Sequence, residues 1–358
     1  MKDKTSPLFS TYILDGVQME ETPFSALYDC LDGNGTISVP QKQYESIVDE
    51  YMDKVPTTFE YDLSKADEYA TKIIQSAYSK KVVDLSYTVS WTKAAINNLL
   101  LETIFKDGHF RLQDLLLMCQ WDWVNAPAGN MAAFYDSTVT AGRYLADLGV
   151  KLDRYFIEKN HRHCIFEIVV RSRIKGRRKC SDNMTPISSD WLVYIPFDTC
   201  RLHLGGSALS TLVGHGSGHE MDVDDPEYFA DCYEVVRELI EDGVITAGVP
   251  VGRGGLMVAA EKFRGHYGFN MNIGGIMQAT GEKDPIKVLF AEKPGVLVQF
   301  RDVDYDYVDS QFMLMDLAYY PVGHPDASMH AITVENSQKD NVANILSALL
   351  EQASEGED

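Results

Sequence analysis

Two glycine-containing turns are the parts of this sequence best suited to binding chemistry. Gly205-Gly206-Ser207 follows an apolar segment and stands at the expected start of a helix, where bare backbone N–H groups can bind an anion. Gly254-Gly255 forms a second such turn, but Arg253 precedes it. An enzyme that uses phosphate and Mg²⁺ needs a carboxylate at that position. The chain therefore keeps the frame of a phosphate-binding enzyme without its metal ligands.

Each turn also has a structural explanation. For Gly205-Gly206-Ser207, a tight strand-to-helix turn capped by the serine explains the residues as well as a phosphate cradle does. For Gly254-Gly255 the structural explanation is favoured, because no acidic residue stands beside the turn. His215 and His219 flank another glycine-rich loop. The pattern defines no third ligand there, so we expect a surface loop and no metal site.

The composition is that of an acidic globular protein. The 358 residues carry a formal net charge of −21, which disfavours nucleic acid as the main partner because phosphate contacts need a cationic surface. No apolar run reaches the length of a membrane span, and the N-terminus lacks the apolar core of a signal peptide. We therefore expect no membrane partner. The six cysteines are scattered without a CxxC pair, so we expect reduced thiols and a cytoplasmic location.

Two further segments have distinctive residues. Six cations lie within residues 171–179, and we favour a solvated loop between strands over a docking patch for a phosphate or an acidic partner. Residues 32–38 resemble the core of a calcium-binding loop. Cys30 and Gln41 stand where calcium needs an aspartate and a glutamate, so a tight turn is predicted instead.

Hydrophobic periodicity predicts helices and strands along most of the chain. Residues 112–123 are strongly apolar, and Trp121 and Trp123 are expected to be core residues. The alternation of strands and helices after residue 188 favours an α/β layer architecture. Helices are predicted over residues 44–52, 93–105, 131–148, 226–240, 254–263 and 341–352, and strands over 164–170, 191–197, 269–273, 296–300 and 330–334.

Four segments, taken in order, resemble motifs of one enzyme family. Residues 91–105 resemble its Gly-Glu-Ala-x-Thr-Asn helix, and residues 119–137 its Asn-Trp-Met-Trp … Pro-Gly-Glu … Leu-Tyr-Asp-Ala segment. Residues 202–214 match its Leu-Gly-Gly-Ser segment, and residues 288–300 resemble its Leu-Phe-x-Glu … Gly strand pair. The family is phosphoribosylformylglycinamidine (FGAM) synthase, of the aminoimidazole ribonucleotide (AIR) synthase superfamily, and the likeness is to the C-terminal half of its synthetase core.

The resemblance implies a fold and a chemistry. It implies an AIR-synthase-like fold of two domains, of the α+β and α/β classes. An N-terminal α+β dimerisation domain (81–187) precedes an α/β domain (188–358). Residues 1–80 form a divergent N-terminal extension in this division. In active members of the family, ATP and Mg²⁺ lie between the two domains, and phosphorylation activates an amide oxygen that a nitrogen nucleophile then attacks. The resemblance also implies a homodimer or a subunit of a larger assembly.

The sequence departs from the family at the residues that carry this chemistry. Lys93 stands where the resemblance places a metal-binding glutamate, whereas Asn97 is retained. The segment 249–255 lacks the histidine and both aspartates of the family's His-Asp-x-Ser-Asp-Gly-Gly motif and has Arg253 instead. Two cations at one site would repel Mg²⁺, although they could bind phosphate directly. Four spare acids could serve as rearranged ligands: Asp153, Glu158, Asp222 and Glu261.

These departures lead to three functional hypotheses. The leading one is a pseudoenzyme with a structural or interaction role, without catalytic residues and without a bound metal. The second is an active ATP-dependent ligase of purine biosynthesis, FGAM synthase or a subunit of it. The third is a regulator that binds ATP, ADP or phosphate without Mg²⁺. The residues expected to line a cofactor site are Lys93, Asn97, Gly205, Gly206, Ser207, Arg253, Gly254 and Gly255.

Overall fold

The computed structural model describes residues 6–33, 45–52, 60–76, 82–105, 111–172, 180–214 and 218–336. The predicted helix over residues 341–352 lies outside these ranges, as do residues 34–38 of the glycine-rich turn, residues 173–179 of the basic segment and His215.

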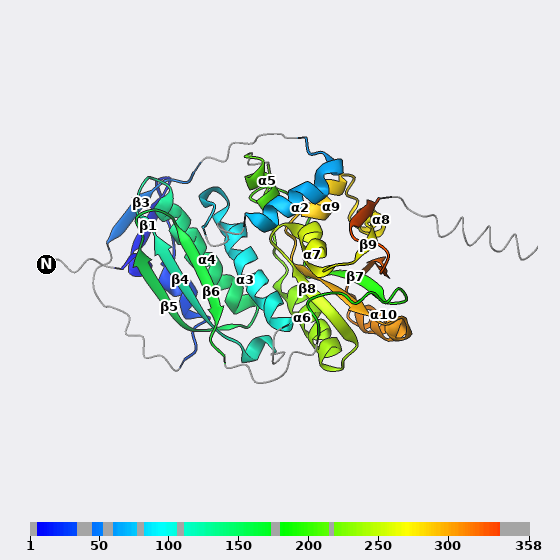
Figure 1. The fold of residues 1–358 in the computed structure, drawn as a ribbon. Helices are drawn as coiled ribbons and strands as arrows, with labels where there is room; N and C mark the ends of the chain where they lie inside the picture. Colours follow the sequence, from blue (N-terminus) through cyan, green and yellow to red (C-terminus); the bar gives the residue numbers. More distant parts are fainter. Residues whose placement is uncertain are drawn as a thin grey trace, which may run out of the picture.

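A three-stranded sheet with the order β5-β4-β6 forms one end of the molecule (Figure 1). Its strands are β4 (Leu116–Trp123), β5 (Lys151–Lys159) and β6 (Ile165–Val170). Buried and partly buried side chains alternate along β4, as expected for a strand with one face on the core. Trp121 and Trp123 are buried, and their indole N–H groups donate to Ser137 Oγ and to the Asn130 carbonyl. The prediction that both tryptophans are core residues is confirmed.

Two long helices pack beside this sheet. They are α3 (Thr88–Phe105) and α4 (Asn130–Asp147), which contact each other. Helix α3 also contacts β6 on one side and β8 (Ile245–Val251) and α6 (Pro226–Glu241) on the other, so it lies between the two sheets (Figure 1). The helices predicted over residues 93–105 and 131–148 are confirmed, and α3 begins five residues earlier than predicted.

Part of the chain before residue 80 packs against α4. A small sheet with the order β2-β1-β3 contains β1 (Thr11–Leu14), β2 (Val17–Gln18) and β3 (Ser46–Asp49), and α1 (Pro23–Tyr28) packs on α4. The helix predicted over residues 44–52 is wrong, because residues 46–49 pair in parallel with β1, a partner that helical spacing cannot reveal. At the end of β3, the Asp49 carboxylate accepts hydrogen bonds from the N–H groups of Gly129, Met131 and Ala132 and so caps α4.

The second sheet is antiparallel, with the order β11-β7-β10-β8. It contains β7 (Trp191–Pro196), β10 (Gly295–Phe300) and β11 (Tyr320–Gly323) besides β8. Every residue of β10 is buried, which fits its central position and its apolar sequence. The β7 and β10 strands and helix α6 confirm the predictions over residues 191–197, 296–300 and 226–240.

Shorter elements complete this part of the molecule. Helix α2 (Ala66–Gln75) packs on α7 (Gly255–Phe263), which in turn contacts β8 and β10. The remaining elements are α5 (Ala208–Leu212), α8 (Gly274–Thr280), α9 (Pro285–Phe290), α10 (Tyr305–Leu314), β9 (Gly268–Asn272), β12 (Pro325–Asp326) and β13 (Ile332–Glu335). The mixed α and β architecture confirms the predicted fold class. Among the described helices, none has the length and apolar character needed to span a membrane.

Candidate functional site

A cavity of about 60 Å³ lies where the Gly205-Gly206-Ser207 turn faces helix α3. Asn97 reaches it from α3, and Arg253 reaches it from the turn between β8 and α7. The structure therefore brings together five of the eight residues expected at a cofactor site. Lys93, Gly254 and Gly255 are not among the residues that line this cavity. Its volume has room for only a few water molecules, whereas small-molecule sites usually measure about 300–1,000 Å³.

Packing within the protein accounts for the first glycine turn. Gly206 has a φ of +73°, and a Cβ atom there would lie 2.8 Å from the Tyr87 side chain. A Cβ atom on Gly205 would lie 2.5 Å from the carbonyl oxygen of His219. Ser207 Oγ accepts a hydrogen bond from Ser210 N at 3.2 Å, which is an ordinary helix cap. These contacts explain the three residues of the turn without a ligand.

Glu292 joins the two glycine turns. Its Oε1 atom accepts hydrogen bonds from Ala208 N at 2.7 Å and from Gly254 N at 2.8 Å, at the first turns of α5 and α7. An internal carboxylate therefore binds the backbone amides that could otherwise bind a phosphate. Burial raises the pKa of Glu292, although Arg253 and the two amides act in the opposite direction. Glu292 lies in segment 288–300, but no feature of the sequence pattern predicts this role for it.

Arg253 and Asn97 have unused hydrogen-bonding capacity at this cavity. Arg253 forms no hydrogen bond or ion pair with any part of the chain that the structure describes. Asn97 is buried, and its Oδ1 atom accepts a hydrogen bond from Tyr144 OH at 2.8 Å. Its Nδ2 atom is buried and lacks a partner among the described residues. Arg253 also lines a neighbouring cavity of about 290 Å³ between α2, α3 and α7.

Lys93 contacts the segment before α6 and helix α4. Its Nζ atom donates to the carbonyl oxygen of Val223 at 2.5 Å, lies 3.5 Å from Asp224 Oδ1 and is 5.5 Å from the centre of the Tyr144 ring. The ammonium thus ties α3 to the segment before α6. Arg253 lines the cavity at the glycine turns, whereas Lys93 lines a neighbouring cavity that shares Ser90 and Met221 with it.

The residues of this cavity do not fit Mg²⁺. Glu292 is the one carboxylate among the described residues that line it, and two amides already bind one of its oxygens. Mg²⁺ needs several oxygen ligands in octahedral geometry. Of the spare acids, Asp153 pairs with Arg154 and Arg171 on the distant sheet, and Glu261 pairs with Arg264. Across the described ranges, no three His, Cys, Asp or Glu side chains are grouped so that they could hold a metal ion.

Comparison with known proteins agrees with the resemblance seen in the sequence. The chain matches no protein-family model. It is 24% identical over 236 residues to human phosphoribosylformylglycinamidine synthase. The aligned region covers 62% of this chain and 17% of the human protein. It is 23% identical over 227 residues to the probable chloroplastic/mitochondrial enzyme of Arabidopsis thaliana, covering 60% and 16%. The chain thus spans less than a fifth of the length of these curated relatives.

Solved structures show the same fold. Thermotoga maritima PurL complexed with FGAR superposes with a TM-score of 0.53 at 12% identity, over 72% of this chain and 43% of that one. The same protein complexed with AMPPCP gives a TM-score of 0.50 at 11% identity, over 71% and 40%. PurLQS from Thermotoga maritima gives a TM-score of 0.50 at 13% identity, over 66% and 37%. The chain is FGAM-synthase-like in sequence and AIR-synthase-like in fold.

Proposed function

We propose that this FGAM-synthase-like chain is a pseudoenzyme with a structural or interaction role. The observation that carries the proposal is that Glu292 accepts hydrogen bonds from the backbone of both glycine turns. In the cavity between α3 and the two glycine turns it is the one carboxylate among the described lining residues, and both turns use it as a hydrogen-bond acceptor. The turns then serve as scaffold, with their amides satisfied by the protein itself.

The active-ligase alternative needs carboxylates that this cavity does not offer. Phosphoryl transfer relies on metal ions and cations that neutralise the developing charge on the phosphate oxygens. Arg253 could contribute a positive charge, but a metal needs several oxygen ligands. Asp153 and Glu261 are engaged in ion pairs elsewhere. On this proposal, changing Lys93→Glu together with Arg253→Asp restores little activity with formylglycinamide ribonucleotide, and strong recovery would contradict it.

A second candidate function, metal-free binding of a nucleotide or phosphate, is favoured by Arg253. The guanidinium forms no hydrogen bond or ion pair within the described residues, although the Glu292 charge acts on it, and it borders both the cavity of about 60 Å³ and the neighbouring one of about 290 Å³. An arginine with free donors is well suited to a phosphate group. Trp91 lines both cavities and offers an aromatic surface beside Arg253.

Calorimetric titration with ATP and ADP separates the three functions. Purified protein is titrated with Mg²⁺ present and then with EDTA. Absence of binding in both conditions supports the structural role. Binding that persists in EDTA and disappears in Arg253→Met, but not in the surface variant Arg301→Met, establishes the metal-free site. Binding that requires Mg²⁺ refutes the pseudoenzyme proposal.

The expected partner is a second copy of the chain or another subunit. Phe156 on β5 is 43% exposed, which is high for a phenylalanine on a strand and suits a sheet that another chain covers. Sedimentation velocity of the wild type and of Phe156→Glu tests this idea. We expect a dimer or larger species that the glutamate dissociates, and a wild-type monomer at all concentrations would contradict it.

A further inference from the structure

A separate cavity of about 610 Å³ lies between β7, β11 and α8. Its lining includes Lys293, from the loop that leads into β10, and residues 198–203, which follow β7. This volume falls in the range of small-molecule sites. None of the residues expected at a cofactor site lines it, and it does not depend on the function proposed above.

Lys293 is buried without a partner. Its residue exposure is 5%, and it makes no hydrogen bond or ion pair within the described parts of the chain. Its Nζ atom is accessible to the solvent of the cavity that the residue lines. Burial lowers the pKa of Lys293, with Cys200 and Asp198 acting in the opposite direction. An ammonium in this position gains strongly from an anionic partner.

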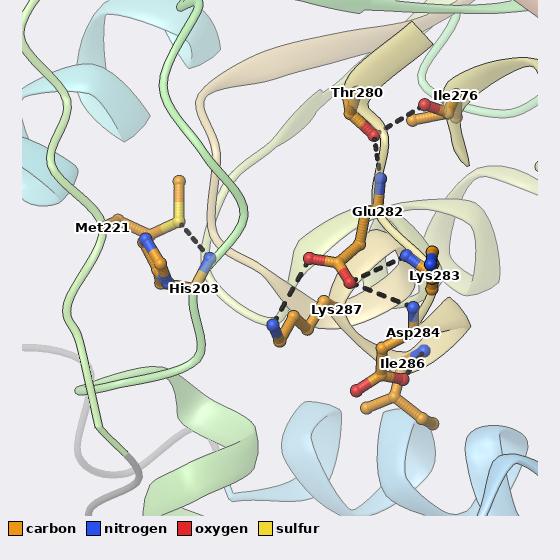
Figure 2. A network of polar contacts seen from close by, with 9 residues as sticks. All are labelled: His203, Met221, Ile276, Thr280, Glu282, Lys283, Asp284, Ile286 and Lys287. Carbon is orange, nitrogen blue, oxygen red and sulfur yellow. Dashed lines mark hydrogen bonds and ion pairs between the residues drawn. The ribbon is translucent and has the colours of Figure 1, made fainter. Parts of the chain in front are cut away.

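The acidic residues around the cavity are already engaged. The Asp198 carboxylate accepts hydrogen bonds from Cys200 N at 2.7 Å and from Asp225 N at 3.1 Å. Figure 2 shows Glu282 between Lys287, whose Nζ lies 3.3 Å from its Oε2, and the backbone N–H groups of Lys283 and Asp284. The charges of Glu282 and Lys287 therefore compensate each other. Asp198 keeps its charge and acts on Lys293, but forms no ion pair with it.

Hydroxyl and guanidinium donors line the same cavity as the ammonium. Tyr194 and Tyr320 line the cavity with their rings nearly parallel, at 24° and 6.4 Å between centroids. Neither hydroxyl has a hydrogen-bond partner among the described residues, and neither is sealed from solvent. Arg201, which is exposed at the edge of the cavity, also has no partner in the described chain. The unused groups are thus donors and cations, which is the chemistry of an anion site.

We propose that this cavity binds a small metabolite through an oxyanion, either a carboxylate or a phosphate, with Lys293 as its counter-charge and the hydroxyls of Tyr194 and Tyr320 as hydrogen-bond donors. Arg201 stands at the entrance and attracts the anion to a chain whose overall charge is negative. The occupant is compact, because the volume of the cavity is about 610 Å³.

Thermal unfolding of the full chain with inorganic phosphate and, separately, with succinate tests the proposal. Sodium chloride at equal ionic strength is the control, because salt also screens the net negative charge. We expect one or both anions to raise the Tm beyond the chloride effect. Lys293→Met should weaken the affinity for the anion by about tenfold or more, the usual effect of losing a charge-assisted hydrogen bond, so that a correspondingly higher anion concentration is needed for the same Tm shift. The exposed variant Lys283→Met should keep the wild-type affinity. A response to phosphate alone indicates a phosphate ester, and a response to succinate alone indicates a carboxylate.

The stability of the unliganded variant distinguishes a binding residue from a structural one. Because the ammonium forms no hydrogen bond or ion pair within the described residues and its burial is costly, Lys293→Met should unfold at the same or a higher temperature than the wild type without anion. A lower Tm for this variant, with no anion effect on the wild type, would overturn the proposal. Arg253→Met should keep the response, and its loss there would show that the anion binds at the glycine turns instead.

A second measurement needs no variant at Lys293. In the wild-type protein, limited acetylation followed by mass spectrometry reports the reaction rate of each lysine. Phosphate or succinate should slow acetylation of Lys293 and leave Lys283 unchanged, relative to sodium chloride. Equal rates for Lys293 in all three salts would refute the assignment even if Lys293→Met fails to fold.

Discussion

Replacing Glu292 by alanine tests whether the two glycine turns form an anion cradle that the protein fills itself. The substitution leaves Ala208 N and Gly254 N without their acceptor. It also leaves Arg253 without a nearby negative charge. The deleted group, CH₂–COO⁻, has the size and charge of acetate. Exogenous acetate should therefore occupy the space and restore the lost hydrogen bonds.

The expected loss of stability follows from these contacts. Each hydrogen bond to a charged acceptor contributes about 1.5–3 kcal/mol, so the two bonds together account for about 3–6 kcal/mol. Removing the carboxylate also removes the cost of burying it, which offsets part of this loss. We expect Glu292→Ala to lower the free energy of unfolding by about 2–4 kcal/mol, a large part of the stability of a typical domain.

Urea unfolding with and without acetate measures the rescue. Acetate at ten times its dissociation constant should restore about 1.4 kcal/mol to Glu292→Ala, by mass action on the folded state. The matched variant Glu292→Gln keeps a side-chain carbonyl acceptor, so it should lose less stability and show no rescue. Chloride at the same ionic strength should have little effect on either variant.

Two results would refute this reasoning. A loss below about 0.5 kcal/mol in Glu292→Ala, the range of ordinary surface substitutions, would show that the two amides do not depend on the carboxylate. A full loss that acetate, formate and phosphate all fail to rescue would show that the cradle collapses and does not act as an anion site.

Three further predictions concern charged side chains. The pKa of Glu292 is raised in the folded protein, so the stability of the wild type relative to Glu292→Gln should fall as the pH rises above the unfolded pKa of about 4.3. Urea unfolding at several pH values measures this slope, and a rise in relative stability would contradict the raised pKa. Asp49→Ala should cost about 0.5–2 kcal/mol of stability at neutral pH, because it removes the cap of α4. Hydrogen bonds lower the pKa of Asp49 despite burial, so this difference in stability should vanish as the pH falls through the folded pKa. A difference that stays unchanged in acid would argue against the cap. Lys93→Met should weaken the contact with Val223 by about 1 kcal/mol and leave any ADP binding seen by calorimetry unchanged, in contrast to Arg253→Met; loss of binding in both variants would mean that the two cations act at one site.

Local sequence patterns identified the elements whose burial follows a simple period. The apolar runs that became β7 and β10 could be recognised because both strands are buried and carry few polar residues. The four-residue spacing within residues 93–105 and 131–148 likewise revealed α3 and α4. Their first residues were less predictable, since α3 begins at Thr88 after a 3₁₀ turn that Asp84 initiates.

Elements that depend on distant partners were missed. Residues 46–49 form a strand because β1, more than 30 residues away, pairs with them. Strand β8 contains a glycine and a proline, which weaken any local strand signal. The proline is tolerated because β8 lies at the edge of its sheet. Strand β5 has a register shift after Leu152 and carries Phe156 on its exposed side, so its apolar residues do not alternate simply with polar ones.

The sequence by itself determined the family likeness, the acidic character of the chain and the two glycine turns with Arg253 in place of an acid. Only the tertiary structure decided which of these groups meet. It engaged Lys93 with the Val223 carbonyl, joined both turns through Glu292, and left Lys293 buried in a different cavity. The physical reason is that hydrogen-bond partners such as Ala208 and Glu292 lie 84 residues apart in the chain, so their contact depends on packing and not on local spacing.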